Sequence, residues 1–344
     1  MPPVARAKTE KPILAVTMGD PAGIGPEIIV KALSSPAVHR VCRPVVVGDA
    51  SVLEESLRFG PQGLSVRPIE HLERLAPSSR QIDVLDLGLL RAGQVRPGIP
   101  GKKAGKAAVE YITEAADLAS SRLVAGIVTA PINKEIIHAA GYEFSGHTEL
   151  LASLTKTKHY GMMLVGGGLR VLLATIHMPL KKAISSLTVE KVHEKILLAH
   201  RAMLALGIRR PRIALAGLNP HAGEGGLFGK EESTILEPAV LKARRIGIEV
   251  SDPLPPDTVF YWAKEGRYDV VVALYHDQGL IPVKVLSFGQ AVNVTVGLPF
   301  VRTSVDHGTA YDIAGKGKAD PRSLLAAIQT AADLASTSAS RKSG

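Results

Sequence analysis

Short apolar runs alternate with amphipathic stretches along the first third of the chain. The apolar runs have the length and composition of buried strands and occupy residues 13–18, 44–50, 82–88 and 124–135. Apolar residues at helical spacing fill 104–122. Strands that alternate with helices predict an α/β fold with a mostly parallel sheet. In such sheets ligands bind beyond the carboxyl ends of the strands.

Three later apolar runs each end near a histidine. The run 170–180 contains His177, the run that begins at 212 leads to Asn219 and His221, and 271–277 contains His276. A single histidine at a strand end is usually structural or solvated, but three in equivalent places indicate a common role. Three neutral imidazoles suit Zn²⁺, Co²⁺, Fe²⁺ or Ni²⁺ and leave positions open for substrate oxygens. We therefore expect a metal site.

The stretch 271–314 combines two strand-like runs, VVALYHD and VNVTVGLPFVRTSVDHGTA, with many polar side chains. Those side chains are His276, Asp277, Lys284, Asn293, Arg302, Asp306 and His307. Packing alone does not explain so many charged groups beside buried strands. The pattern predicts a site for a small, anionic, metal-chelating substrate.

A glycine-rich turn, GDPAGIGPE at 19–27, joins the first strand to a helix. The unpaired N–H groups at a helix start suit an anion or a cofactor. Neither a GK[ST] nor a GxGxxG motif is present. The alternative is a tight turn whose glycines serve the backbone alone.

Two other positions have both a capping and a functional interpretation. Residues 145–149, SGHTE, open a helix. There Ser145 or Thr148 is a cap, or His147 with a neighbouring hydroxyl binds a phosphate or carboxylate. Asp257 follows two prolines and is either a helix N-cap or a functional carboxylate.

Composition limits the remaining possibilities. At 344 residues the chain is long enough for two α/β lobes, and its one cysteine excludes an intramolecular disulfide. A net charge of +9 raises the question of nucleic acid, but only 4% of residues are aromatic and no DNA-binding motif is present. No apolar run reaches membrane-spanning length and the N-terminus has no signal-peptide pattern. We expect no nucleic-acid or membrane partner and a cytoplasmic location.

The run DHGTAYDIAGKGKADP at 306–321 resembles the cofactor-contacting loop of the isocitrate and isopropylmalate dehydrogenase superfamily, whose members also carry a GDGIGPE-like turn. A closer resemblance is to the 4-hydroxythreonine-4-phosphate dehydrogenase family of vitamin B6 biosynthesis. The similar segments lie between residues 18 and 319 and include MGDPAGIGPEI, SGHTELLA, GLNPHAGEGGLFGKEE, PLPPDTVF, YHDQGLIPVK and VNVTVGLPFVRTSVDHGTAYDIAGKGKA.

The resemblance implies two open α/β lobes around a central cleft, as in the isocitrate and isopropylmalate dehydrogenases. Both segments on the cofactor side lie toward the chain ends. We therefore expect residues 1–130 plus 285–344 to form a cofactor-side lobe that carries both termini. Residues 131–284 are expected to form a central lobe with the metal ligands and the dimer contacts.

The resemblance also implies the site residues. One divalent metal (Zn, Mg or Co) is expected at His177, His221 and His276. The phosphorylated substrate is expected at His147, Thr148, Lys284, Asn293 and Arg302. NAD or NADP is expected at Gly23, Gly25, His307, Gly308, Thr309, Ala310 and Asp312. Asp277 and Asp257 are candidates for proton transfer or for orienting metal and substrate, and the family's homodimer shares each active site between its subunits.

The implied reaction is NAD-dependent oxidation of 4-phosphooxy-L-threonine to 2-amino-3-oxo-4-phosphooxybutanoate, which decarboxylates to 3-amino-2-oxopropyl phosphate. Related enzymes oxidise a phosphorylated four-carbon sugar acid, such as 4-phospho-threonate or erythronate, or a cyclic diol dicarboxylate. A non-catalytic metal- or phosphate-binding protein is the alternative from another class. The intact DHGTAYDIAGKG segment favours an enzyme.

Overall fold

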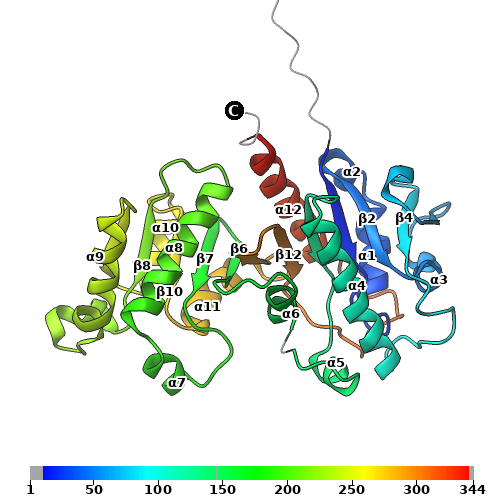
Figure 1. Ribbon diagram of the computed structural model, residues 1–344. Coiled ribbons are helices and arrows are strands. Elements are labelled where there is room, and N and C mark those ends of the chain that lie inside the picture. The colour runs from blue at the N-terminus through cyan, green and yellow to red at the C-terminus, as the bar shows by residue number, and fades with distance from the viewer. Residues whose placement is uncertain (1–10, 145, 341–344) are drawn as a thin grey trace, which may run out of the picture.

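A computed structural model describes residues 11–144 and 146–340, and these residues form one sheet of twelve strands flanked by helices (Figure 1). The strands are β1 (Ile13–Thr17), β2 (Arg43–Gly48), β3 (Ser65–Ile69), β4 (Gln81–Asp86), β5 (Gly126–Thr129), β6 (Gly161–Gly166), β7 (Leu169–Leu173), β8 (Ile213–Ala216), β9 (Val250–Leu254), β10 (Val270–Ala273), β11 (Val292–Val296) and β12 (Val301–Val305).

The helices cover both faces of this sheet. They are α1 (Gly25–Leu33), α2 (Pro36–Val41), α3 (Ala50–Glu55), α4 (Lys102–Ser120), α5 (Lys134–Ala139), α6 (His147–Leu154), α7 (Leu180–Ser185), α8 (Val189–Ala205), α9 (Glu237–Arg245), α10 (Val259–Lys264), α11 (His276–Ser287) and α12 (Arg322–Ser340). Four single turns complete the elements: η1 (Leu57–Phe59), η2 (Leu72–Arg74), η3 (Pro220–Gly226) and η4 (Glu232–Leu236).

The strand order is β3-β4-β2-β1-β5-β12-β11-β6-β7-β10-β8-β9. Neighbouring strands are parallel except at β12–β11, β11–β6 and β6–β7. The prediction of a mostly parallel α/β sheet is therefore confirmed. The antiparallel strands lie in the middle, between a half built on β1–β5 and a half built on β7–β10 (Figure 1).

Both ends of the described chain belong to the half that contains β1. The C-terminal helix α12 packs on β12 and β5 and also contacts α1 and α2. The strands β6 to β10, all from the middle of the chain, build the other half. The boundaries near residues 130 and 285 remain a prediction, because β11 and β12 join the two halves in one continuous sheet.

Two expected elements differ from those observed. The run 271–277 is a strand only over β10, and His276 instead begins helix α11. The run 292–310 is not one strand but the hairpin β11–β12, because Gly297 adopts a φ of +99° between the two strands. The strands β3, β6 and β9 have no counterpart in the sequence interpretation.

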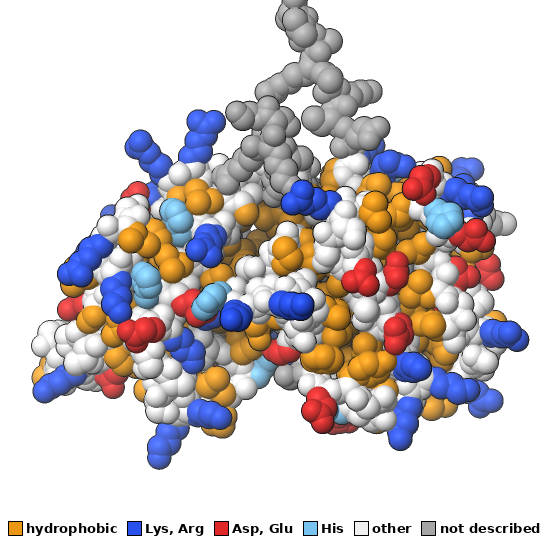
Figure 2. Space-filling view, in the orientation of Figure 1, with side chains coloured by type: hydrophobic (Ala, Val, Ile, Leu, Met, Phe, Trp, Pro, Cys, Tyr) orange, Lys and Arg blue, Asp and Glu red, His pale blue; other side chains and the backbone are white. Residues whose placement is uncertain are grey.

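The surface charge is dispersed on the face shown in Figure 2. Lys and Arg side chains are spread around its outline, and Asp and Glu side chains lie between them. The surplus of +9 therefore does not gather into one stripe on this face. No helix of the described residues is long and apolar enough to cross a membrane.

Candidate active site

A cleft of about 540 Å³ lies in the middle of the molecule, where the two halves meet. Its walls come from the ends of β5, β7 and β12, from the start of α6, and from β6 and β11. Thr129, His147, Thr148, Asn293 and Arg302 are among the residues that line it. The size is typical of a small-molecule site.

Arg302 is the central cation of the cleft and is only 2% exposed. It projects from β12 and donates hydrogen bonds to the hydroxyls of Thr295 and Thr129, both at 2.8 Å. The described residues provide no carboxylate partner, and the buried Nε has no hydrogen-bond partner at all. Burial lowers the pKa of Arg302 to about 9, although the negative charge of Glu149 opposes this effect. Such a guanidinium is suited to an incoming anion.

The start of α6 places His147 and Thr148 next to this guanidinium. Thr148 and Thr295 share a hydrogen bond of 3.3 Å between their hydroxyls. Burial first, and then the charge of Arg302, lower the pKa of His147 well below its ordinary value, so its ring is neutral. Its Nε2 and the Oδ1 of Asn293 are buried without partners, so both are available to a ligand.

Two of the three histidines expected to bind a metal lie side by side. The rings of His177 and His276 are 5.3 Å apart between centroids, because β7 and β10 are adjacent parallel strands. Asp277 Oδ1 lies 2.7 Å from His276 Nδ1. This contact orients the imidazole and leaves its Nε2 for another ligand.

His221 does not join this pair. It follows β8, the other neighbour of β10, but the turn η3 carries it aside in a left-handed backbone segment, with φ of +52° at His221. Its ring instead lies 6.3 Å from that of Phe228. Within residues 11–144 and 146–340 no group of three metal-ligating side chains comes together. One chain thus offers two imidazoles that fit a divalent ion, and a complete set requires a further ligand.

The expected substrate residue Lys284 is at some distance from the guanidinium pocket. It lies on α11 and forms an ion pair with Asp306, with Nζ and Oδ2 3.2 Å apart. Asp306 follows β12, so the pair links α11 to the strand that carries Arg302. Lys284 does not line the cleft, in contrast to the other four expected substrate residues.

Asp257 is exposed in the turn before α10 and does not line the cleft. The N-cap of α10 is Thr258, so the interpretation of Asp257 as a cap is wrong. The cause is a one-residue shift, because the turn that begins at Pro256 continues through Thr258. Of the other two possible caps, Ser145 lies outside the described residues, and Thr148 lies inside α6, whose N-cap is Gly146.

The two segments expected to bind the nucleotide are packed against each other. The Ile24 N–H donates to Thr309 O at 3.0 Å, and a Cβ on Gly23 would lie 2.9 Å from that same oxygen. A Cβ on Gly25 would lie 2.2 Å from Met18 O. Both glycines are therefore required by close backbone packing. Gly308 has open space around its Cα, so packing does not explain that glycine.

Two buried carboxylates hold these segments together. Asp20 Oδ2 accepts a hydrogen bond of 2.5 Å from the Tyr311 hydroxyl, and burial raises the pKa of Asp20. Glu27 accepts from the backbone N–H groups of Gly317 and Ala319 and pairs with Lys31. Ala310, which precedes Tyr311, has a φ of +42°, and Asp312 is exposed. His307 lines the cleft, so this loop borders the substrate pocket.

Several cleft residues were missed from the sequence. They are Lys134, Glu149, Lys158, Tyr160 and Lys195. Part of the signal was present, because three glycines at 166–168 separate two apolar runs and indicate a hairpin. That hairpin is β6–β7, and recognising it would have placed Tyr160 at the start of a central strand.

Comparison with known protein families identifies the relatives of this chain. Residues 40–331 match the family described as "Pyridoxal phosphate biosynthetic protein PdxA". The chain belongs to this family. It is 47% identical to 4-hydroxythreonine-4-phosphate dehydrogenase of Desulforapulum autotrophicum (94% of this chain, 95% of the relative) and 49% identical to D-threonate 4-phosphate dehydrogenase of Cupriavidus necator (94% and 97%).

The fold agrees with this membership. The crystal structure of 4-hydroxythreonine-4-phosphate dehydrogenase from Klebsiella pneumoniae superposes with a TM-score of 0.89 at 47% identity, covering 94% of this chain and all of that one. The expected mixed α/β architecture of the family is thereby confirmed. The protein is a PdxA-family oxidoreductase, and its relatives divide between two substrates that differ at carbon 2.

Proposed function

We propose that the protein catalyses the NAD-dependent, divalent-metal-dependent oxidation of 4-phosphooxy-L-threonine. The product, 2-amino-3-oxo-4-phosphooxybutanoate, loses CO₂ to leave 3-amino-2-oxopropyl phosphate. The observation that carries this proposal is the buried Arg302 guanidinium, which has no ion pair among the described residues, in a cleft that His177 also lines beside His276. The guanidinium suits an anionic end of the substrate, and the histidine pair suits a site for the metal that binds the carbon 3 hydroxyl.

The chain's own residues bind and orient the substrate. Arg302, the Thr148 hydroxyl and the neutral His147 bind one anionic group of the substrate. Asn293 Oδ1, a buried acceptor, is available for a substrate N–H or O–H. Fixing both ends of a short substrate places the carbon 3 hydroxyl beside the histidine pair.

The histidine pair fits a divalent ion held by neutral imidazole nitrogens. A divalent metal held by His177 and His276 would lower the pKa of the substrate's carbon 3 hydroxyl and polarise the ketone, and a bound nicotinamide would supply the hydride acceptor. Asp277 holds the Nδ1 of His276 and so directs its Nε2 away from itself. The hydroxyl proton leaves to a base, for which exposed Asp277 is our candidate rather than Asp257, because Asp277 lies at the histidine pair through its contact with His276.

We further propose a homodimer whose sites are shared, with the third metal ligand supplied by His221 of the second copy. Helix α11 supports this assignment, since Ile281, Val285 and Phe288 are 60%, 78% and 83% exposed and recur at helical spacing on one face. An apolar stripe of this kind on a surface helix marks a contact surface. The helix begins at His276, so a partner docked there comes close to the metal pair.

A second candidate substrate is D-threonate 4-phosphate, because a relative with that activity is 49% identical over 94% of the chain. It carries a hydroxyl at carbon 2 in place of an ammonium group. The anion pocket and the histidine pair serve both substrates. Within the cleft, Glu149 is a carboxylate with no hydrogen bond or ion pair among the described side chains, and a carboxylate favours the ammonium form.

Steady-state kinetics with the two substrates test this choice. NADH formation is followed at 340 nm with 4-phosphooxy-L-threonine and with D-threonate 4-phosphate, at equal concentrations of NAD and Zn²⁺, Co²⁺ or Mg²⁺. The proposal expects a higher kcat/KM for the amino acid. An equal or higher kcat/KM for the sugar acid would assign the protein to the second activity, and no turnover of either would refute both.

A further inference from the structure

A second cavity, of about 620 Å³, lies behind the substrate cleft. The central strands lie between the two spaces, which meet at Arg302, a residue that lines both. On β6, Met162 lines the cleft and Met163 lines the second cavity. On β11, Asn293 lines the cleft while Val294 and Val296 line the second cavity. This space, which we call the rear cavity, therefore lies against the opposite face of the strands that bind substrate.

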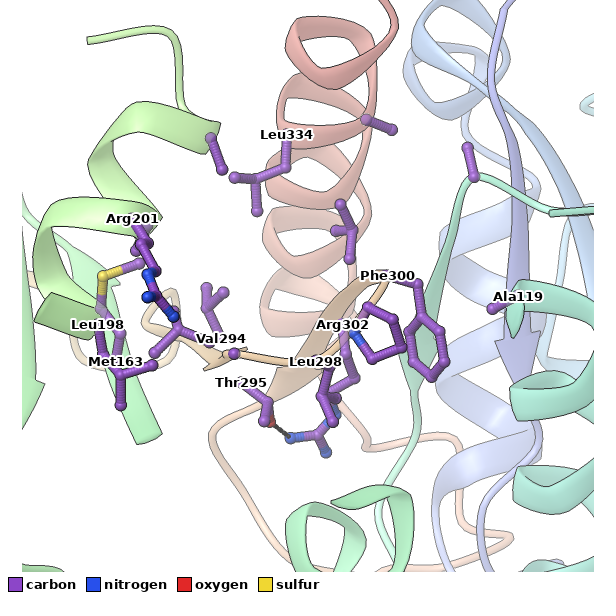
Figure 3. Close-up of a pocket in the computed structure, with 18 of the residues that line it drawn as sticks. Ala119, Met163, Leu198, Arg201, Val294, Thr295, Leu298, Phe300, Arg302 and Leu334 are labelled. Carbon is purple, nitrogen blue, oxygen red and sulfur yellow. Dashed lines mark hydrogen bonds between the residues drawn. The ribbon is translucent and has the colours of Figure 1, made fainter. Parts of the chain in front are cut away.

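The walls of the rear cavity are mainly apolar and come from both halves of the molecule (Figure 3). Leu198 and Ala202 come from α8 and Leu334 comes from α12. Leu298 and Phe300 belong to the turn between β11 and β12. The volume lies within the range of about 300–1,000 Å³ that small-molecule sites occupy. Shape and apolar lining thus suit a compact organic ligand.

The charges at the rear cavity have one sign. Arg122, Arg201 and the buried Arg302 line it; Arg122 and Arg201 are exposed, and neither of these two has a hydrogen bond or an ion pair within the described part of the chain. In Figure 3 Arg201 extends from α8 toward β11. No Asp or Glu lines the cavity, and the one histidine there, His159, is paired with Glu194. Two unpaired guanidinium groups beside apolar walls call for an anionic group on an apolar body.

We propose that the rear cavity is a second ligand site, for a small amphipathic anion that carries a carboxylate, sulfonate or phosphate on an aromatic or aliphatic body. The anionic group pairs with Arg201 and Arg122, and the body fills the space between α8, α12 and the β11–β12 turn. Such a ligand contacts the strands of Asn293 and Arg302 from behind. This proposal does not depend on which substrate binds in the cleft.

The test uses 8-anilinonaphthalene-1-sulfonate, an aromatic sulfonate whose fluorescence rises in apolar surroundings. The full chain is expected to bind one dye per subunit. 4-Phenylbutyrate should displace the dye, whereas the neutral 4-phenylbutanamide should not. Arg201→Glu should weaken dye binding by about tenfold or more, the loss expected for one charge-assisted hydrogen bond. Arg245→Glu, an exposed site on α9, should leave binding unchanged.

A filling variant provides a second, independent arm. Ala202→Phe places a ring in the rear cavity from α8 and should abolish dye binding while the circular dichroism spectrum and melting temperature stay near those of the parent. Displacement of the dye by NAD or by the phosphorylated substrate would show that the dye binds in the substrate cleft and would overturn the proposal. Equal affinity of the Arg201→Glu and Arg245→Glu variants, or equal displacement by the acid and the amide, would overturn it as well.

Discussion

Replacing Arg302 by methionine separates function from stability in this protein. Arg302 is 2% exposed, donates hydrogen bonds to two threonine hydroxyls and has no ion pair among the described residues. Removing one partner of a buried charge pair costs about 2–5 kcal/mol in binding. We therefore expect Arg302→Met to lower kcat/KM for the phosphorylated substrate by about a hundredfold, which corresponds to about 3 kcal/mol.

The same substitution should raise the stability of the ligand-free protein. Burial lowers the pKa of Arg302 to about 9, which means that folding disfavours its charged form. A methionine of similar length removes that cost, and replacing buried charges by apolar groups stabilises proteins by about 1–4 kcal/mol. With an unfolding entropy of about 2 cal/mol/K per residue, a gain of about 2 kcal/mol raises Tm by about 3 °C for this chain.

The pH dependence of this gain has a definite sign. Above pH 9 the folded protein releases the Arg302 proton while the unfolded chain retains it, so the parent becomes more stable as pH rises from 9 toward 12. The advantage of the methionine variant should therefore be constant below pH 9 and shrink above it.

Differential scanning calorimetry and NADH kinetics measure the two effects on the same preparations. Arg245→Met, on the exposed face of α9, is the matched control and should change neither. A methionine variant that melts earlier than the parent and keeps its kcat/KM would refute the reasoning. In that case Arg302 would be a structural residue of the β12 hairpin and not the anion site.

His276→Ala should abolish metal-dependent turnover and weaken Co²⁺ binding measured by absorbance. The control His138→Ala, on α5, should behave as the parent. Retention of Co²⁺ binding by His276→Ala would contradict the metal assignment. Val285→Asp should shift the protein from dimer to monomer in analytical ultracentrifugation and remove activity, since it puts a charge into the exposed stripe of α11, while Leu241→Asp on α9 should not. Glu27→Gln should lower Tm by about 3 °C and raise the KM for NAD, because the Glu27 carboxylate accepts hydrogen bonds from two backbone N–H groups of the 306–321 segment. Weakening these hydrogen bonds costs about 2 kcal/mol of stability. An unchanged KM for NAD would show that this segment does not bind the nucleotide.

Short apolar runs that alternate with stretches of helical spacing were enough to predict the class of the fold. β1, β2, β4 and β5 all overlap the apolar runs of the first third. The sheet order was not accessible in the same way, because β11 returns antiparallel between β12 and β6. Pairing between strands so distant in sequence depends on tertiary packing, which a local pattern does not contain.

The candidate site was predicted in part, for a physical reason. His177 and His276 follow adjacent parallel strands, so strand ends alone predicted their approach. His221 follows the next strand, but a left-handed turn displaces it, and periodicity does not report the sign of φ. Lys284 lies on helix α11, which the sequence interpretation did not predict, and it pairs with Asp306. Local patterns thus indicate which residues reach the site and not how each one is aimed.

The most direct test of the central assignment is a metal-restoration assay on protein dialysed against EDTA. NADH formation at 340 nm is measured with NAD and 4-phosphooxy-L-threonine before and after addition of Zn²⁺, Co²⁺ or Mg²⁺, and in parallel with 4-hydroxy-L-threonine, which lacks the phosphate. The account predicts no turnover without metal, restored turnover with it, and a kcat/KM at least about a hundredfold lower for the substrate without phosphate. Full activity of the metal-free protein, or equal turnover of the two substrates, would contradict it.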